Sequence, residues 1–199
     1  MLFFFSSACT VIGESDSSFS NESVRIIARS SLAAFLAQIP LGHESRYGFL
    51  HRGEFARATL AVPLRVYTTY PDSLNGDNDT LSNRPVALNE WRVPVLVDGE
   101  FRSLITIALV DGVLKAVELG GTALAREFGE FDKKYPGARR SLFRLYLLKC
   151  DFIVLDRTGA GADEDEYHPL RSARLVFNAG SPSPRSRREG KWMGKAEMR

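Results

Sequence analysis

Apolar residues recur every three or four positions in the stretch that follows Ser20, which is the spacing of one face of an α-helix. Ser20 suits the N-cap position, because its side-chain oxygen can accept a hydrogen bond from a backbone amide of the first turn. Pro40 disfavours helical geometry in the residue before it, so the pattern predicts a helix that ends near Gln38. The face that we expect to lie on a sheet contains Val24, Ile27, Phe35 and Ile39.

The clearest strand pattern lies in the middle of the chain, where β-branched and apolar residues fill 91–97, 101–110 and 113–119. Asp98-Gly99 separates the first two runs, and Asp111-Gly112 separates the second and third. Asp-Gly favours the type I′ hairpin turn, in which both central residues take positive φ. The pattern therefore predicts a three-stranded β-meander.

Weaker patterns complete the expected fold. They predict a helical turn over 54–60, a strand over 64–70, a helix over 123–134 capped by Thr122, a buried strand over 145–155 and a last strand over 173–177. Together they predict an α+β fold: one antiparallel sheet of about five to six strands with a central meander, covered by two main helices. We expect residues 21–177 to form this single domain, between an N-terminal segment 1–20 and a tail 178–199.

The N-terminal segment contains a short apolar run, Met1–Phe5, followed by Ser6-Ser7-Ala8-Cys9. This order resembles the end of a bacterial lipoprotein signal, and the resemblance implies that Cys9 is acylated and that the residues from Gly13 to Ser20 are a flexible tether. The segment departs from the pattern, because no Lys or Arg precedes Arg25 and Ser6 stands where such signals usually carry Leu. Two alternatives stay open: a true start further upstream, or an apolar terminus without a signal function.

Charge divides the chain unevenly. The whole sequence carries a net charge of +2, but residues 178–199 hold six Lys/Arg against two Glu, so the tail carries +4 and the rest −2. The tail is rich in Pro, Ser and Gly, which predicts disorder, and its cations with Trp192 suit phosphates or anionic lipid. Because the folded body is not basic, we expect no sequence-specific nucleic-acid recognition.

Known catalytic and cofactor motifs are missing. The sequence lacks a Gly-x-Ser-x-Gly elbow, a phosphate-binding glycine loop and a Cys/His set at zinc spacing, so we expect no cofactor and no metal. The acidic stretches around Asp77 and at 163–166 are read as solvated loops. Cys9 and Cys150 are the two cysteines, and Cys150 stands in an apolar run, which is typical of a small buried hydrophobic residue.

The connector after the first helix, residues 40–55, combines glycine, aromatic and charged residues. Such a loop can bind an anion or position a general base, because histidine titrates near neutral pH. A structural interpretation is simpler: its aromatic residues pin the loop to the core while its charges face water. The candidate ligand-binding residues are His43, Glu44, Arg46, Tyr47, His51 and, from the first meander strand, Trp91.

Three functions remain. The first is a non-enzymatic binding module at the periplasmic or extracellular face of the cell envelope, held in the membrane through a lipid on Cys9 alone, with an unknown protein or small ligand. Small helix-on-sheet domains of this kind resemble the cystatin-like and PepSY-like modules of exported bacterial proteins, an architectural likeness over residues 21–177. The alternatives are a hydrolase using His43 or His51 as base near Glu44, and a cytoplasmic adaptor whose basic tail binds nucleic acid. The oligomeric state stays open.

Overall fold

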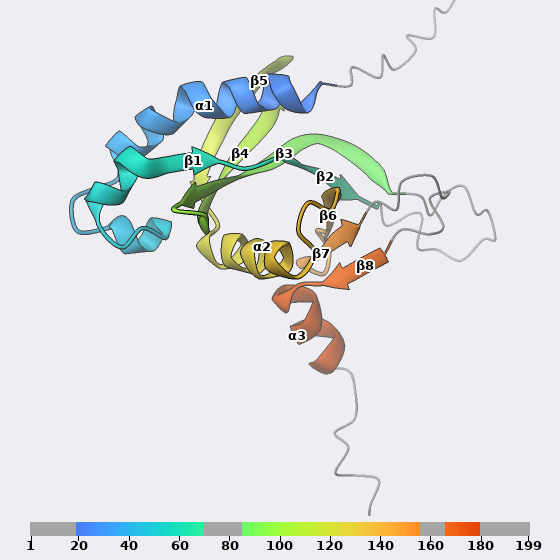
Figure 1. The fold of residues 1–199 in the computed structure, drawn as a ribbon. Helices are drawn as coiled ribbons and strands as arrows, with labels where there is room; N and C mark the ends of the chain where they lie inside the picture. The colour runs from blue at the N-terminus through green and yellow to red at the C-terminus, as the bar shows by residue number, and fades with distance from the viewer. Residues whose placement is uncertain (1–18, 70–84, 156–165, 180–199) are drawn as a thin grey trace, which may run out of the picture.

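The computed structural model describes residues 19–69, 85–155 and 166–179. These residues form a mixed α+β fold around one large sheet (Figure 1). The helices are α1 (Asn21–Gln38), α2 (Thr122–Lys134) and α3 (Arg171–Ala179), with two 3₁₀ helices, η1 (Glu44–Tyr47) and η2 (Arg52–Arg57). The strands are β1 (Ala58–Leu60), β2 (Leu64–Thr68), β3 (Val86–Val97), β4 (Glu100–Val110), β5 (Val113–Gly120), β6 (Arg140–Leu145), β7 (Cys150–Leu155) and β8 (Glu166–Pro169).

The sheet confirms the predicted fold class but is larger than expected. Seven of its eight strands lie in the order β5-β4-β3-β2-β6-β7-β8. The eighth, β1, pairs with β3 next to the part of β3 that pairs with β2. The sheet is also not wholly antiparallel, because β2 and β6 pair in parallel through Val66–Leu142 and Tyr67–Phe143. The number of strands is higher because β1 and β8 were not predicted and because two strands, β6 and β7, take the place of the single strand expected over 145–155.

The first helix begins and ends as expected. The Ser20 side chain accepts a hydrogen bond from the Ser23 amide at 3.2 Å, and α1 ends at Gln38. Val24, Ala28 and Leu36 form its most buried side chains.

The meander is confirmed. At the first turn, Asp98 and Gly99 have φ of 52° and 80°, and at the second turn Asp111 and Gly112 have φ of 53° and 75°. Both central residues are left-handed in each case, as a type I′ turn requires. The strand β3 begins five residues earlier than predicted, at Val86.

Three predicted elements were wrong. The run 145–155 is not one strand: β6 ends at Leu145, a turn with Lys149 at φ 52° follows, and β7 returns with Cys150 paired to Leu145. An unbroken apolar run does not reveal a turn, and here Arg144 and Asp151 pair across the hairpin. The predicted strand 173–177 lies in α3, where the Arg174 amide donates to the Leu170 carbonyl at 2.9 Å.

The third misplaced element is the helical turn expected over 54–60, which is η2 followed by β1. A smaller difference concerns α2, whose N-cap is Gly121 at φ 70°, with Thr122 as the first helical residue.

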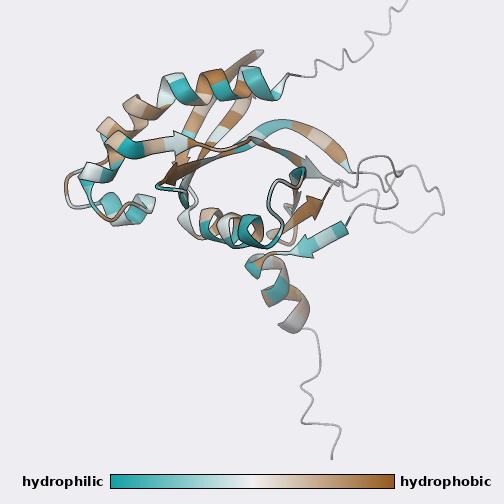
Figure 2. Ribbon diagram, in the orientation of Figure 1, coloured by the Kyte–Doolittle hydropathy of each residue, from teal (hydrophilic) through white to brown (hydrophobic). Residues whose placement is uncertain are grey.

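Two hydrophobic cores lie on opposite faces of the sheet. The helix α1 packs on the face that carries Val93, Val95 and Ile105, over β3, β4 and β5. The helix α2 packs on the other face, against Leu104 of β4 and against side chains of β2, β6 and β7 such as Leu142. Consequently, α1 covers its face of the sheet over β3–β5 but not over β2, β6, β7 and β8 (Figure 1). Of the described helices, α3 contacts β7 and β8, and its Phe177 ring lies 6.1 Å from that of Phe152. Figure 2 shows brown segments in β3 and β4 and in the β6–β7 region, whereas β8 is mainly teal.

Candidate ligand-binding groove

A cavity of about 1180 Å³ lies beside the strands that α1 does not cover, and its lining also includes residues of the α2-side core such as Leu64 and Phe101. We call it the aromatic groove. Its floor is built from β2, β6, β7 and β8, and it contains Tyr67, Phe143, Val154 and Tyr167. These side chains share a face because Tyr67 is paired with Phe143 and Val154 with Tyr167 across neighbouring strands.

The aromatic side chains of the floor are arranged in a row. Phe143 contacts Tyr167 edge-on, with ring centroids 5.5 Å apart, and packs against Phe152 at 6.1 Å. Tyr67 and Phe143 are half-buried, and 40% of Tyr167 is exposed. The floor therefore presents ring surface to an incoming group, while its other side is anchored in the sheet.

Trp91 closes the end of the groove next to α1. It is fully buried, its ring lies 6.2 Å edge-on from Phe19, and the guanidinium of Arg65 stands 5.5 Å from its centroid. The Arg65 Nε also donates to the Leu88 carbonyl at 3.2 Å, which fixes the guanidinium at this wall. Trp91, a candidate from sequence, is thus a rigid wall that positions a cation.

The charged residues of the lining are mainly basic. Arg65, Arg139 and Arg140 line the groove together with one acidic residue, Asp132, which forms an ion pair with Arg140. Among the described lining residues the formal balance is therefore three cations against one anion. Such a surface favours a ligand with negative charge.

The other sequence candidates lie in the connector and do not line the groove. Glu44 is buried and pairs with Arg52 at 3.2 Å, while Arg52 donates to the Ile39 carbonyl. Glu54 is also buried; it accepts the Leu50 amide at 2.7 Å and pairs with Arg102 of β4 at 2.9 Å. These carboxylates fasten the connector to itself and to the sheet.

The two histidines of the connector take no part in the ion pairs of Glu44 and Glu54. His43 and His51 are exposed, and neither shares a hydrogen bond with Glu44 in the described connector. Arg46 is exposed, and Tyr47 packs against the α1 core. The backbone amide of Glu44 and, against the opposing effect of burial, the Arg52 guanidinium hold the pKa of Glu44 below its usual value. The ionised Glu44 carboxylate therefore holds the connector in place and is poorly suited to accept a proton.

Close approach of the backbone fixes the position of the connector. Gly48 has φ of 91°, and a Cβ there would stand 1.9 Å from the Arg102 carbonyl oxygen. The residue next to it, Phe49, is fully buried and contacts Phe55 edge-on at 5.0 Å.

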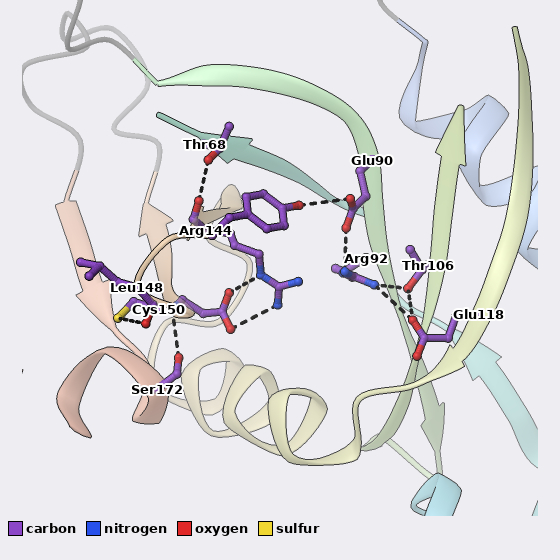
Figure 3. A network of polar contacts seen from close by, with 11 residues as sticks. Thr68, Glu90, Arg92, Thr106, Glu118, Arg144, Leu148, Cys150 and Ser172 are labelled. Atoms are coloured by element: carbon purple, nitrogen blue, oxygen red, sulfur yellow. Dashed lines mark hydrogen bonds and ion pairs between the residues drawn. The ribbon is translucent and has the colours of Figure 1, made fainter. Parts of the chain in front are cut away.

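A polar network on the opposite face of the sheet was not foreseen from the sequence (Figure 3). Arg92 of β3 forms an ion pair with Glu90 at 2.6 Å and lies beside Thr106 of β4, which is paired in turn with Glu118 of β5. The Tyr146 hydroxyl lies 3.3 Å from Glu90, and burial together with Glu90 raises the pKa of this tyrosine. The charged residues at every second position of β3, Glu90 and Arg92, were the signal for this row.

This network continues through the β6–β7 hairpin, where Arg144 and Asp151 form two hydrogen bonds of 2.6 and 3.2 Å. The Thr68 hydroxyl donates to the Arg144 carbonyl at 2.8 Å. Because each charge has an opposite partner, the arrangement stabilises strand pairing and offers no free acid or base.

Cys150 is the one cysteine of the described residues and is fully buried. Burial, and to a lesser degree Asp151, raises the pKa of its thiol, which disfavours the reactive thiolate. Across the described part of the chain, no three His, Cys, Asp or Glu side chains are grouped so that they could hold a metal. In the same ranges, no helix has the length and apolar character needed to cross a membrane.

Several sequence predictions fall outside the described residues. These are the acylation of Cys9, the acidic stretches around Asp77 and at 163–165, and the basic residues of the tail. Comparison with known proteins adds no relationship: no protein-family model, no curated protein and no solved structure matches this chain.

Proposed function

We propose that this chain is a non-enzymatic binding module of the cell envelope, tethered through acylated Cys9, which holds its ligand in the aromatic groove. The observation that carries the proposal is the groove itself. A cavity of about 1180 Å³ with aromatic and arginine side chains in its lining is suited to holding a ligand. The lipobox-like order at Cys9 supports the proposed envelope location.

The distribution of titratable groups supports binding rather than catalysis. A general base must lie within hydrogen-bond reach of the proton that it removes. In the groove lining the one carboxylate, Asp132, is engaged by Arg140, and the connector histidines lie elsewhere. The groove therefore has groups that can hold and orient a ligand, and its described lining contains no histidine or cysteine.

Site-specific photo-crosslinking in bacterial cells tests the groove. A benzoylphenylalanine probe at Tyr67 samples the groove floor, and the same probe at Arg29, on the exposed surface of α1, is the matched control. We expect an envelope-associated adduct from the Tyr67 probe and none from the Arg29 probe. Equal labelling from both positions, or none from either, would contradict the binding role of the groove.

Incorporation of a labelled fatty acid tests the tether separately. We expect label in the protein and its loss in Cys9→Ala. A protein that carries no label and stays in the cytoplasm would contradict the envelope location, whatever the groove binds.

A further inference from the structure

We propose that the ligand of the aromatic groove is an extended peptide segment in which carboxylate side chains stand next to aromatic or large apolar ones. This inference rests on the proposed function and names its ligand class. Three features of the groove carry it: the charge of its lining, the row of rings on its floor, and the strand edges along its sides.

The charge selects an anionic partner. Arg65 is held between Trp91 and the Leu88 carbonyl at one wall, and Arg139 and Arg140, which follow α2, also line the groove. The lining therefore carries more positive than negative formal charge, which favours carboxylates on the ligand. Arginine also has a planar fork of donors that matches the geometry of a carboxylate.

The floor selects apolar or aromatic side chains. Tyr67, Phe143 and Tyr167 come from three strands, β2, β6 and β8, so their rings spread across the sheet. Neighbouring strands lie roughly 4.8 Å apart, so the row is longer than a single ring and can contact several side chains of a bound segment. Half-buried aromatic residues of this kind anchor peptide side chains well.

The sides of the groove favour an extended backbone. The β2–β6 pairing is recorded at Val66–Leu142 and Tyr67–Phe143, and the segments before it, 61–64 and 138–141, both line the groove. No strand pairing is recorded between these two lining segments in the described residues, because the β2–β6 pairing begins at Val66 and Leu142. Backbone groups along them can therefore accept the backbone of an added strand.

The volume of the groove also favours a peptide segment as its ligand. Sites for small molecules typically enclose roughly 300–1,000 Å³. The groove has about 1180 Å³, so its volume lies above that range. A segment of several residues fits this space better than a single metabolite.

Fluorescence anisotropy on the full-length chain tests the ligand class. The probe is a labelled decapeptide of alternating serine, glutamate and phenylalanine, and its counterpart has lysine for each glutamate. We expect the acidic peptide to bind at least tenfold more tightly than the lysine peptide, and its affinity to fall as salt rises, because exposed charges are screened. Arg65→Gln should weaken binding about threefold, the effect of one partly exposed ion pair, and Phe143→Ala should weaken it more.

The matched control is Arg29→Gln, which removes a cation from the exposed surface of α1 and should leave binding unchanged. Thermal unfolding of each variant shows that the groove variants remain folded. Equal binding of the acidic and lysine peptides would overturn the proposed ligand class, as would tighter binding of an oligothymidylate than of the acidic peptide. If the acidic peptide does not bind while the Tyr67 probe still forms its crosslink in cells, the result supports the proposed binding module and contradicts the proposed ligand class.

Discussion

The two halves of the sheet differ in what covers the same face. Over β3, β4 and β5, the helix α1 packs on that face and encloses a core of fully buried residues that includes Val93 and Ile105. Over β2, β6, β7 and β8, the same face carries half-buried aromatic residues and arginines. The covered half encloses a core, and the half that α1 leaves uncovered is where we propose that a ligand binds. A side chain therefore has a different role depending on which half it occupies.

Replacing one aromatic residue in each half gives the largest expected difference. Trp91→Ala, at the fully buried end of β3, should cost about 4 kcal/mol of unfolding free energy, because a large cavity forms beside Phe19. Phe143→Ala, on the half-buried floor, should cost about 1–2 kcal/mol, because part of its area is already in water. Urea denaturation measures both values. Equal losses would mean that the uncovered half contributes to the core as much as the covered half does.

A glycine pair in the connector gives the next largest effect. Gly48→Ala places a Cβ against the Arg102 carbonyl and keeps a left-handed φ, so we expect a loss of about 3 kcal/mol. The control, Gly42→Ala, has φ of 81° but no atom within 4 Å, and should cost about 1 kcal/mol through backbone strain alone. Chemical denaturation of the two variants separates steric contact from strain. A Gly48→Ala loss no larger than the Gly42→Ala loss would show that the connector does not press against β4.

The smallest predicted effect depends on pH. Because the folded-state pKa of Glu44 lies below the ordinary value of 4.5, its carboxylate stabilises the fold above about pH 4.5. This contribution is lost as the pH falls through the lowered folded-state pKa. Glu44→Gln should therefore destabilise the protein at pH 7 and much less at pH 3, as measured by urea denaturation at each pH. Glu130→Gln, on the exposed surface of α2, is the control. A destabilisation that does not change with pH would show that the charge of Glu44 does not matter.

The same division between the halves separates what the sequence could predict from what it could not. The covered half is built from local signals: Ser20 caps α1, Pro40 follows its end, and each Asp-Gly pair turns one strand directly into the next. The uncovered half depends on β2 pairing with β6, more than seventy residues later in the chain. No local pattern encodes such a pairing, so the sheet was expected to be wholly antiparallel.

The aromatic row of the candidate groove was not predicted from the sequence for the same reason. Tyr67, Phe143 and Tyr167 are unremarkable in their own segments and form a row only once the strands are in register. Trp91 was a candidate because it stands out in its strand, and it does line the groove. The connector drew attention through its density of charge, but Glu44 and Glu54 are paired with Arg52 and Arg102. A high density of charged residues in a sequence does not distinguish structural ion pairs from a binding site, because the sequence does not show which charges pair with one another.

The first residues of the described chain have a consequence for where the proposed module would find its ligand. Phe19, Ser20 and Asn21 line the groove, and Cys9 lies ten residues before Phe19. Ten residues span at most about 35 Å when fully extended. An acyl chain on Cys9 would therefore confine the groove to a thin layer above the bilayer. A partner anchored in the same membrane within that reach would meet it at an effective concentration on the order of millimolar. An affinity that is weak in solution would then be sufficient at the membrane, and a partner free in the surrounding fluid would gain no such advantage.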